Sequence, residues 1–182
     1  MAVAERGTAV EPSAGLMTRA LRALGRVLLA LPWPLAAALP VLWAGLIWRL
    51  SSRPVPFPTG VSIVWELVSN LAHAPLFGLL CLFSAAFSWR GSHGWPVVGR
   101  ARALALVALV GAYGVLDEWH QSRTPGRDSS AFDVVTDVVG ASMVLWIVAY
   151  LGRPDAREGG LWARLAAAMA ASVAAAALSS LS

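Results

Sequence analysis

Long apolar stretches separated by short polar segments set the pattern of the chain. Apolar runs occupy about residues 27–48, 63–89, 103–121, 131–151 and 165–181, and the segments between them are rich in proline, glycine and charged residues. A helix needs about 20 apolar residues to cross the hydrocarbon core of a bilayer. The pattern therefore predicts an all-α fold, a polytopic transmembrane helix bundle of about five spans, or four if the alanine-rich last run is not inserted.

The same pattern divides the chain into three parts. Residues 1–26 contain no sustained apolar run, so we expect a cytoplasmic N-terminal tail. Residues 27–151 are expected to form a four-helix membrane core, and residues 152–182 a charged loop followed by an alanine-rich membrane helix. Arginines before an apolar run are also typical of signal peptides, but the first run is long and no small-residue cleavage site follows it. We therefore expect a retained first span.

Composition supports a membrane protein. Of the 182 residues 58% are hydrophobic and 13% charged, and the mean hydropathy is +0.66, which excludes a soluble domain of this size. The single Cys81 lies in an apolar run, so no disulfide framework is expected. Although the net charge is +4, nucleic acid is not an expected partner of so apolar a chain.

The distribution of arginine predicts the orientation. With five spans and the N-terminus inside, the inner segments carry ten arginines (four, three and three) and the outer loops carry four, namely Arg49, Arg53, Arg123 and Arg127. Cytoplasmic loops are enriched in basic residues. The N-terminus is therefore expected in the cytoplasm, and the polar loop around residue 125 on the outer face of a bacterial cell membrane.

Polar residues are concentrated between residues 117 and 137. Pro125-Gly126 predicts a tight turn between two helices, with Ser129 or Ser130 capping the second. Helical spacing places Asp117, His120 and Gln121 on one face and turns Glu118 and Trp119 elsewhere. After the turn, spacings of four and three form a second stripe of Asp133, Asp137 and Gly140.

A third polar stripe lies at the start of the second span, where Glu66, Asn70 and His73 are four and three residues apart. All three stripes fall near the outer ends of their spans, so we expect them to line one outward-facing cavity with His73 as its floor. A carboxylate that faces lipid at mid-depth costs about 2.5–3.5 kcal/mol on insertion scales, and such residues therefore tend to face the interior of a bundle and to mark function.

These positions supply the candidate site residues. The acid-base candidates are His73, Asp117, His120 and Asp133, and the candidate ligand-binding residues are Glu118, Gln121, Arg123, Arg127 and Asp137. The planar guanidinium of Arg127, beside a turn at the membrane surface, suits a phosphate or carboxylate. A structural alternative is that Asp117 and Asp133 pair with Arg123 and Arg127 to hold two helix ends together. No metal motif is recognisable, so no metal and no cofactor are expected.

The motif Asp117-Glu118-x-His120-Gln121-x-x-x-Pro125-Gly126-Arg127, followed by Asp133-x-x-x-Asp137-x-x-Gly140, resembles the signature of the VanZ-like family of bacterial membrane proteins. Ser51-Ser52-Arg53-Pro54 and His73-x-x-x-Phe77-Gly78 resemble two weaker motifs of the same family, and the resemblance covers roughly residues 40–150. Asp137 stands where an asparagine is common, and Phe77 where a tyrosine is common. The resemblance implies a role in the cell envelope and an association with low-level resistance to the glycopeptide teicoplanin.

Three hypotheses about function follow. The first is a protein that binds an anionic membrane lipid or lipid-linked cell-wall intermediate, with its head group at Arg127. The second is an intramembrane enzyme that acts on a lipid-linked substrate through histidine and aspartate, although no serine or cysteine nucleophile motif is present. The third is a structural component of an envelope complex, with another membrane protein or a second copy of this chain as its partner.

Overall fold

The structure is a computed structural model that describes residues 15–53, 63–90, 95–127 and 129–179. This part of the chain contains six helices and no strand. The helices are α1 (Leu16–Leu29), α2 (Trp33–Ser51), α3 (Ile63–Ser88), α4 (Arg100–Gln121), α5 (Ala131–Leu151) and α6 (Glu158–Ser179). The all-α prediction is confirmed.

Four of these helices are long and apolar enough to cross a membrane: α2, α3 from Leu67, α5, and α6 as far as Leu178. The alanine-rich last helix, whose insertion the sequence left open, is among them, and it begins at Glu158 and not near residue 165. α4, which covers the third span expected from the sequence, is not among the four; charged residues lie at both of its ends, Arg100 and Arg102 at the start and Asp117 and Glu118 near the finish. The four helices indicate a membrane-embedded protein.

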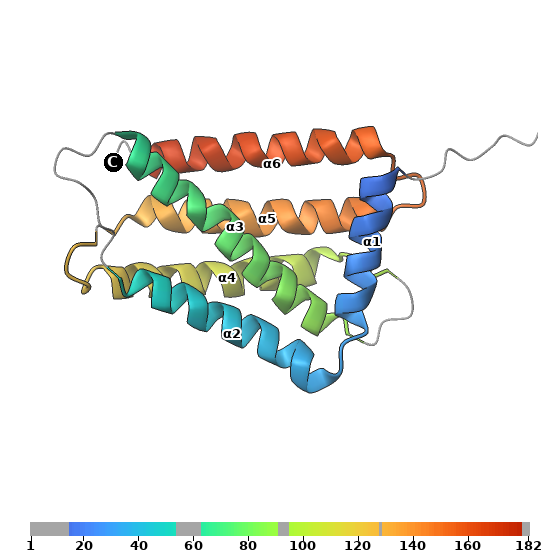
Figure 1. The fold of residues 1–182 in the computed structure, drawn as a ribbon, viewed down its shortest axis with the longest axis horizontal. Coiled ribbons are helices and arrows are strands. Elements are labelled where there is room, and N and C mark those ends of the chain that lie inside the picture. Colours follow the sequence, from blue (N-terminus) through green and yellow to red (C-terminus); the bar gives the residue numbers. More distant parts are fainter. Residues whose placement is uncertain (1–14, 54–62, 91–94, 128, 180–182) are drawn as a thin grey trace, which may run out of the picture.

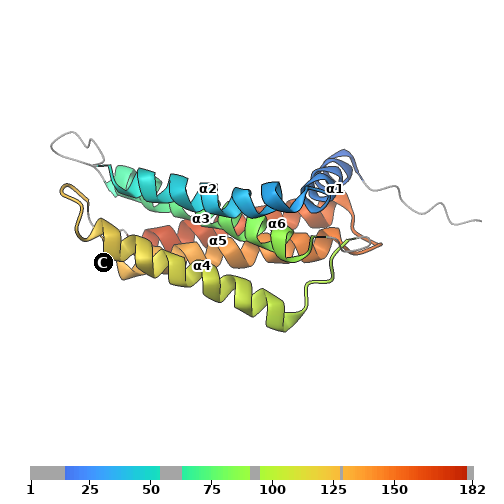
Figure 2. The ribbon, with the colours of Figure 1, turned by 90° about the horizontal axis from the view of Figure 1, so that it is seen from below.

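The long helices lie side by side, and α1 crosses their ends. In Figure 1, α2, α4, α5 and α6 follow the long axis of the molecule while α3 crosses them diagonally, and Figure 2 shows the same bundle from below. One end of the bundle, on the left in Figure 1, gathers the last residues of α2 and α4 and the first residues of α5. We call this the polar end, because the acidic residues of the sequence motif lie there. α1 crosses the opposite end.

The first membrane helix starts later than the sequence indicated. We expected a span from residue 27, but residues 16–29 form the separate helix α1 and α2 begins at Trp33. Pro32 and Pro34 explain the break, because proline favours the first positions of a helix and disrupts its interior. Arg22 holds α1 against the end of α5, because its guanidinium donates to the carbonyl oxygens of Leu151 and Arg153 at 2.8 and 2.6 Å.

α3 and α5 pack closely because glycine residues lie where the two helices cross. A larger residue at these positions would force the helices apart. The position of a Cβ atom on Gly140 of α5 would overlap the backbone of Ala74 in α3, and one on Gly78 would lie 3.3 Å from the Gly140 carbonyl oxygen. Such small residues let membrane helices pack backbone to backbone. Beside this crossing lies the apolar core, which includes the fully buried Phe77 and Val110.

Candidate functional site

The turn between α4 and α5 brings two acidic helix ends together. Gly126 has a φ of 77°, a left-handed conformation that glycine adopts without strain, which confirms the predicted turn. Ser130 is the N-cap of α5, and its side chain accepts a hydrogen bond from the Phe132 amide at 3.2 Å. The capping prediction is therefore confirmed, and the last turn of α4 lies beside the first turn of α5.

The buried face of α4 is wider than the sequence indicated. Asp117, Glu118 and Gln121 are all buried, with exposed fractions of 1, 8 and 2%, whereas Trp119 is 53% exposed. The expectation that Glu118 turns away from the site was wrong. Because α4 packs against both α5 and α2, its buried arc includes residues on either side of Asp117.

Asp117 is held by uncharged donors. Its Oδ2 atom accepts hydrogen bonds from Ser51 Oγ at 2.9 Å and Gln121 Nε2 at 2.8 Å, while its Oδ1 atom is buried and has no hydrogen-bond partner within the described ranges. Among the described residues it therefore does not form the expected pair with an arginine. Arg123 instead donates to the Trp119 carbonyl oxygen at 3.0 Å and stacks over that indole, 3.8 Å from its centroid.

His73 and Asp137 form a buried pair between α3 and α5. The Nδ1 atom of His73 lies 3.0 Å from Oδ1 of Asp137, whose side chain is fully buried. The second carboxylate oxygen of Asp137 occupies space beside Gly114 that a side chain on α4 would fill, and it has no hydrogen-bond partner in the described part of the chain. The Nδ1 atom of the histidine is thus committed to a carboxylate.

Two further carboxylates, from α4 and α5, lie close to the ring of His73. One ring nitrogen of His73 and one carboxylate oxygen each of Glu118 and Asp133 lie within 4.8 Å of one another, and all three residues are buried. Glu118 is further fixed by the Ser130 amide, which donates to Oε2 at 2.9 Å, and by Gln121 at 3.3 Å from Oε1. One imidazole with two carboxylates is a ligand set that can hold a divalent metal ion. We refer to His73, Glu118 and Asp133 as the ligand triad.

Local spacing could not reveal the ligand triad, which is why no metal was expected from the sequence. Each member comes from a different helix, and the arrangement depends on how α3, α4 and α5 pack. The predicted stripe of Asp133, Asp137 and Gly140 is buried along its length. Glu66, the outermost member of the third stripe, lies outside the described side chains.

His120 does not join the other candidates. Its Nε2 atom lies 2.8 Å from Ser52 Oγ, and its ring stacks on Trp48 with centroids 3.9 Å apart. These contacts place it against α2, away from the pair formed by His73 and Asp137. Two serines that end α2, Ser51 and Ser52, thus bind residues of the α4 motif; the sequence pattern marked both serines but gave neither a role.

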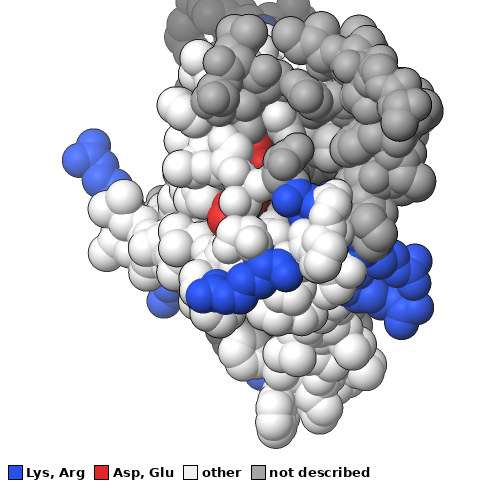
Figure 3. Space-filling view, turned by 90° about the vertical axis from the view of Figure 1, so that its left-hand side faces the viewer, with Lys and Arg blue, Asp and Glu red and all other residues white. Residues whose placement is uncertain are grey.

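Arginine side chains surround the acidic residues at the polar end. Figure 3 views this end and shows small acidic areas recessed between basic and uncharged atoms. Arg127 is half-buried beside the turn, and its Nε atom is buried without a hydrogen-bond partner among the described residues. An unsatisfied buried guanidinium nitrogen is costly, so this Nε atom is available for an acceptor that the described residues do not supply.

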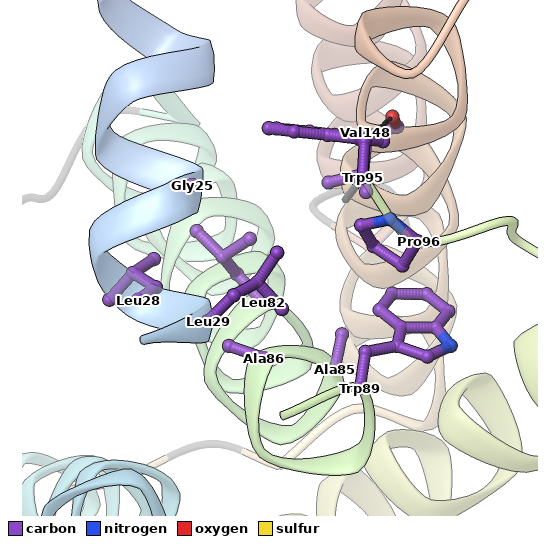
Figure 4. A pocket seen from close by; sticks show the side chains of 10 residues that line it. All are labelled: Gly25, Leu28, Leu29, Leu82, Ala85, Ala86, Trp89, Trp95, Pro96 and Val148. Carbon is purple, nitrogen blue, oxygen red and sulfur yellow. Dashed lines mark hydrogen bonds between the residues drawn. The ribbon is translucent and has the colours of Figure 1, made fainter. Parts of the chain in front are cut away.

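A separate apolar pocket lies at the opposite end of the molecule. Its walls come from α1, the end of α3, residues 95–96 and α5, with Leu28, Leu82 and Trp89 among the lining residues (Figure 4). None of its lining residues is acidic or basic, and it takes no part in the polar site.

Arg153 and Asp155 form an exposed ion pair of 2.7 Å just beyond α5, and the hydrogen bond from Arg153 lowers the pKa of the Asp155 carboxyl.

Comparisons with family models, with curated proteins and with solved structures gave no match to this chain.

Proposed function

We propose that the protein is a VanZ-like membrane protein of the bacterial cell envelope that binds an anionic lipid or lipidated ligand at its polar end. The observation that carries the proposal is the Nε atom of Arg127 beside the turn, which is buried and has no hydrogen-bond partner among the residues that the structure describes. A guanidinium offers paired N–H donors that match a phosphate or carboxylate, and a ligand held there would place its chain against the apolar helices.

The distribution of arginine supports the polar end as the outer face. Four arginines accompany the polar end, and α1 with its three arginines crosses the other end together with the segments around residues 100 and 153. The richer side is the cytoplasmic one under the positive-inside rule. The ligand would then enter from the outer leaflet.

Native mass spectrometry of the protein in mild detergent tests this proposal. We expect the wild type to retain phosphatidylglycerol or a polyprenyl phosphate added to the micelles, and Arg127→Gln to lose at least tenfold in occupancy. Arg153→Gln is the matched control, because that arginine is exposed at the opposite end. Equal occupancy in all three proteins, or none in any, would contradict the proposal.

The link to teicoplanin is tested separately. Expression in a susceptible bacterial host is expected to raise the inhibitory concentration of teicoplanin, and Arg127→Gln to abolish the increase at equal membrane abundance. An unchanged inhibitory concentration with intact lipid binding would confine the function to lipid binding.

The pair formed by His73 and Asp137 favours a second candidate, an intramembrane acid-base enzyme. A carboxylate on Nδ1 fixes the tautomer and orientation of an imidazole and increases the basicity of Nε2. This function predicts turnover of a labelled polyprenyl phosphate or phospholipid that disappears in His73→Gln. Retained binding without any turnover would count against it.

A further inference from the structure

Three carboxylates at the polar end are buried, and the arginines of this end form no ion pair with them in the described part of the chain. The carboxylates of Asp117, Glu118 and Asp137 accept hydrogen bonds from serine, glutamine, a backbone amide and His73, and none of them is paired with an arginine in the described part of the chain. Buried carboxylates without a compensating positive charge are strongly unfavourable. A bound cation would resolve this imbalance.

The ligand triad provides a place for that cation. The ligand atoms of His73, Glu118 and Asp133 lie within 4.8 Å of one another and are shielded from solvent. In a tetrahedral zinc site with bonds of about 2.0–2.2 Å, ligand atoms lie roughly 3.3–3.5 Å apart. The triad would therefore have to contract by at most about 1.5 Å, a movement within the reach of small side-chain rotations.

Asp137 supplies an independent sign of a metal site. It is fully buried, it holds Nδ1 of His73 at 3.0 Å, and its other oxygen has no hydrogen-bond partner among the described residues. Histidines that bind metals commonly donate their second ring nitrogen to a carboxylate, which fixes the ring and strengthens the metal bond. The arrangement leaves Nε2 of His73 for the metal.

We propose that His73, Glu118 and Asp133 bind a divalent cation, with Asp137 orienting the imidazole. One imidazole and two carboxylates suit Zn²⁺ or Mn²⁺ better than Mg²⁺ or Ca²⁺, which prefer oxygen ligands alone. The metal site can be tested apart from the ligand proposed at Arg127, because that arginine is not a member of the ligand triad. An occupied site would nevertheless place positive charge at the polar end, where an anionic head group would benefit from it.

Metal binding to the full-length protein in lipid-free detergent tests the site directly. After removal of metal with a chelator, we expect isothermal titration with ZnCl₂ or MnCl₂ to show one ion per chain. Glu118→Gln and Asp133→Asn are expected to weaken binding at least tenfold, and Asp137→Asn by about 10–100-fold, the usual effect of removing such a partner. The purification tag must contain no histidine.

Two variants serve as matched controls. His120→Gln removes a histidine at the same end that contacts Ser52 and Trp48 instead of the triad, and Asp155→Asn removes an exposed carboxylate at the other end. Both are expected to bind metal like the wild type. The proposal would be overturned if the wild type bound neither metal. It would also be overturned if Glu118→Gln and Asp133→Asn bound metal with the same affinity as the wild type.

X-ray absorption of the zinc-loaded wild type keeps the proposal testable if a variant fails to fold. The expected first coordination shell contains one imidazole and oxygen atoms. A shell with two imidazoles, or with the sulfur of Cys81, would place the metal elsewhere and refute the assignment.

Discussion

Substitution of Gly140 by alanine tests whether the close crossing of α3 and α5 holds the site together. A Cβ atom at this position would lie 2.8 Å from both Cα and the carbonyl carbon of Ala74 and would overlap that residue's carbonyl oxygen. Carbon atoms in contact prefer separations of about 3.5–4.0 Å. Since all three atoms belong to the backbone of α3, they cannot rotate away, and the helices must separate by roughly 1 Å.

The magnitude follows from the cost of overpacking. Inserted methyl groups in packed cores cost about 1–3 kcal/mol, and the backbone contact places Gly140→Ala near the upper limit. For a chain of this size, about 3 kcal/mol corresponds to a Tm lower by roughly 6–12 °C. Because Ala74 follows His73 and Asp137 lies one turn before Gly140, the same separation is expected to break the 3.0 Å contact between His73 and Asp137.

Thermal unfolding in detergent, followed by loss of the monodisperse peak in size-exclusion chromatography, measures this effect. Gly45→Ala is the matched control, because a Cβ atom on Gly45 in α2 meets nothing within 4 Å. We expect its Tm to equal that of the wild type or to exceed it slightly, since alanine favours helix over glycine. Equal Tm values for Gly140→Ala and the wild type would show that the two helices do not meet as described.

Three further substitutions give distinct outcomes. Ser51→Ala removes a donor to the buried carboxylate of Asp117 and is expected to lower the free energy of unfolding by about 1–3 kcal/mol; a smaller change by denaturant titration would argue against a buried bond. His73→Leu should cost about 3–5 kcal/mol by leaving the buried Asp137 without its partner, and adding Asp137→Leu should recover part of the loss; strictly additive costs would rule out coupling. Arg22→Gln should speed amide hydrogen exchange throughout α1 and leave the other helices protected, so equal exchange with the wild type would refute its docking role.

The sequence predicted what depends on local composition and spacing. The all-α class, the turn at Gly126 and the Ser130 cap each depend on a few neighbouring residues, and the structure confirms them. The start of the first membrane helix was wrong because the apolar pattern runs through Leu31 without interruption. Only the pair of prolines that follows separates an amphipathic helix from a membrane helix.

The sequence could predict which residues belong to the polar end, but not which of them contact one another. Spacing on one helix placed Asp117 with His120 and turned Glu118 away, yet α4 has neighbours on two sides, and His120 contacts one of them while Glu118 faces the other. The bond from Ser51 to Asp117 joins residues 66 apart in sequence. No periodicity within a helix encodes such a contact, because it depends on the packing of whole helices.

The position of α1 has a consequence for how the chain is made. Its Arg22 binds the carbonyl oxygen of Leu151, which is synthesised 129 residues later, and the amide of Met17 donates to Glu158, 141 residues away. α1, which leaves the ribosome before the other described helices, therefore completes these contacts only after α5 and the start of α6 have been synthesised. In the interval its apolar residues, such as Leu24 and Val27, can rest on the membrane surface while its arginines face water. Docking of the N-terminal helix is thus one of the last steps of assembly, and a truncated chain that lacks α5 would leave it undocked.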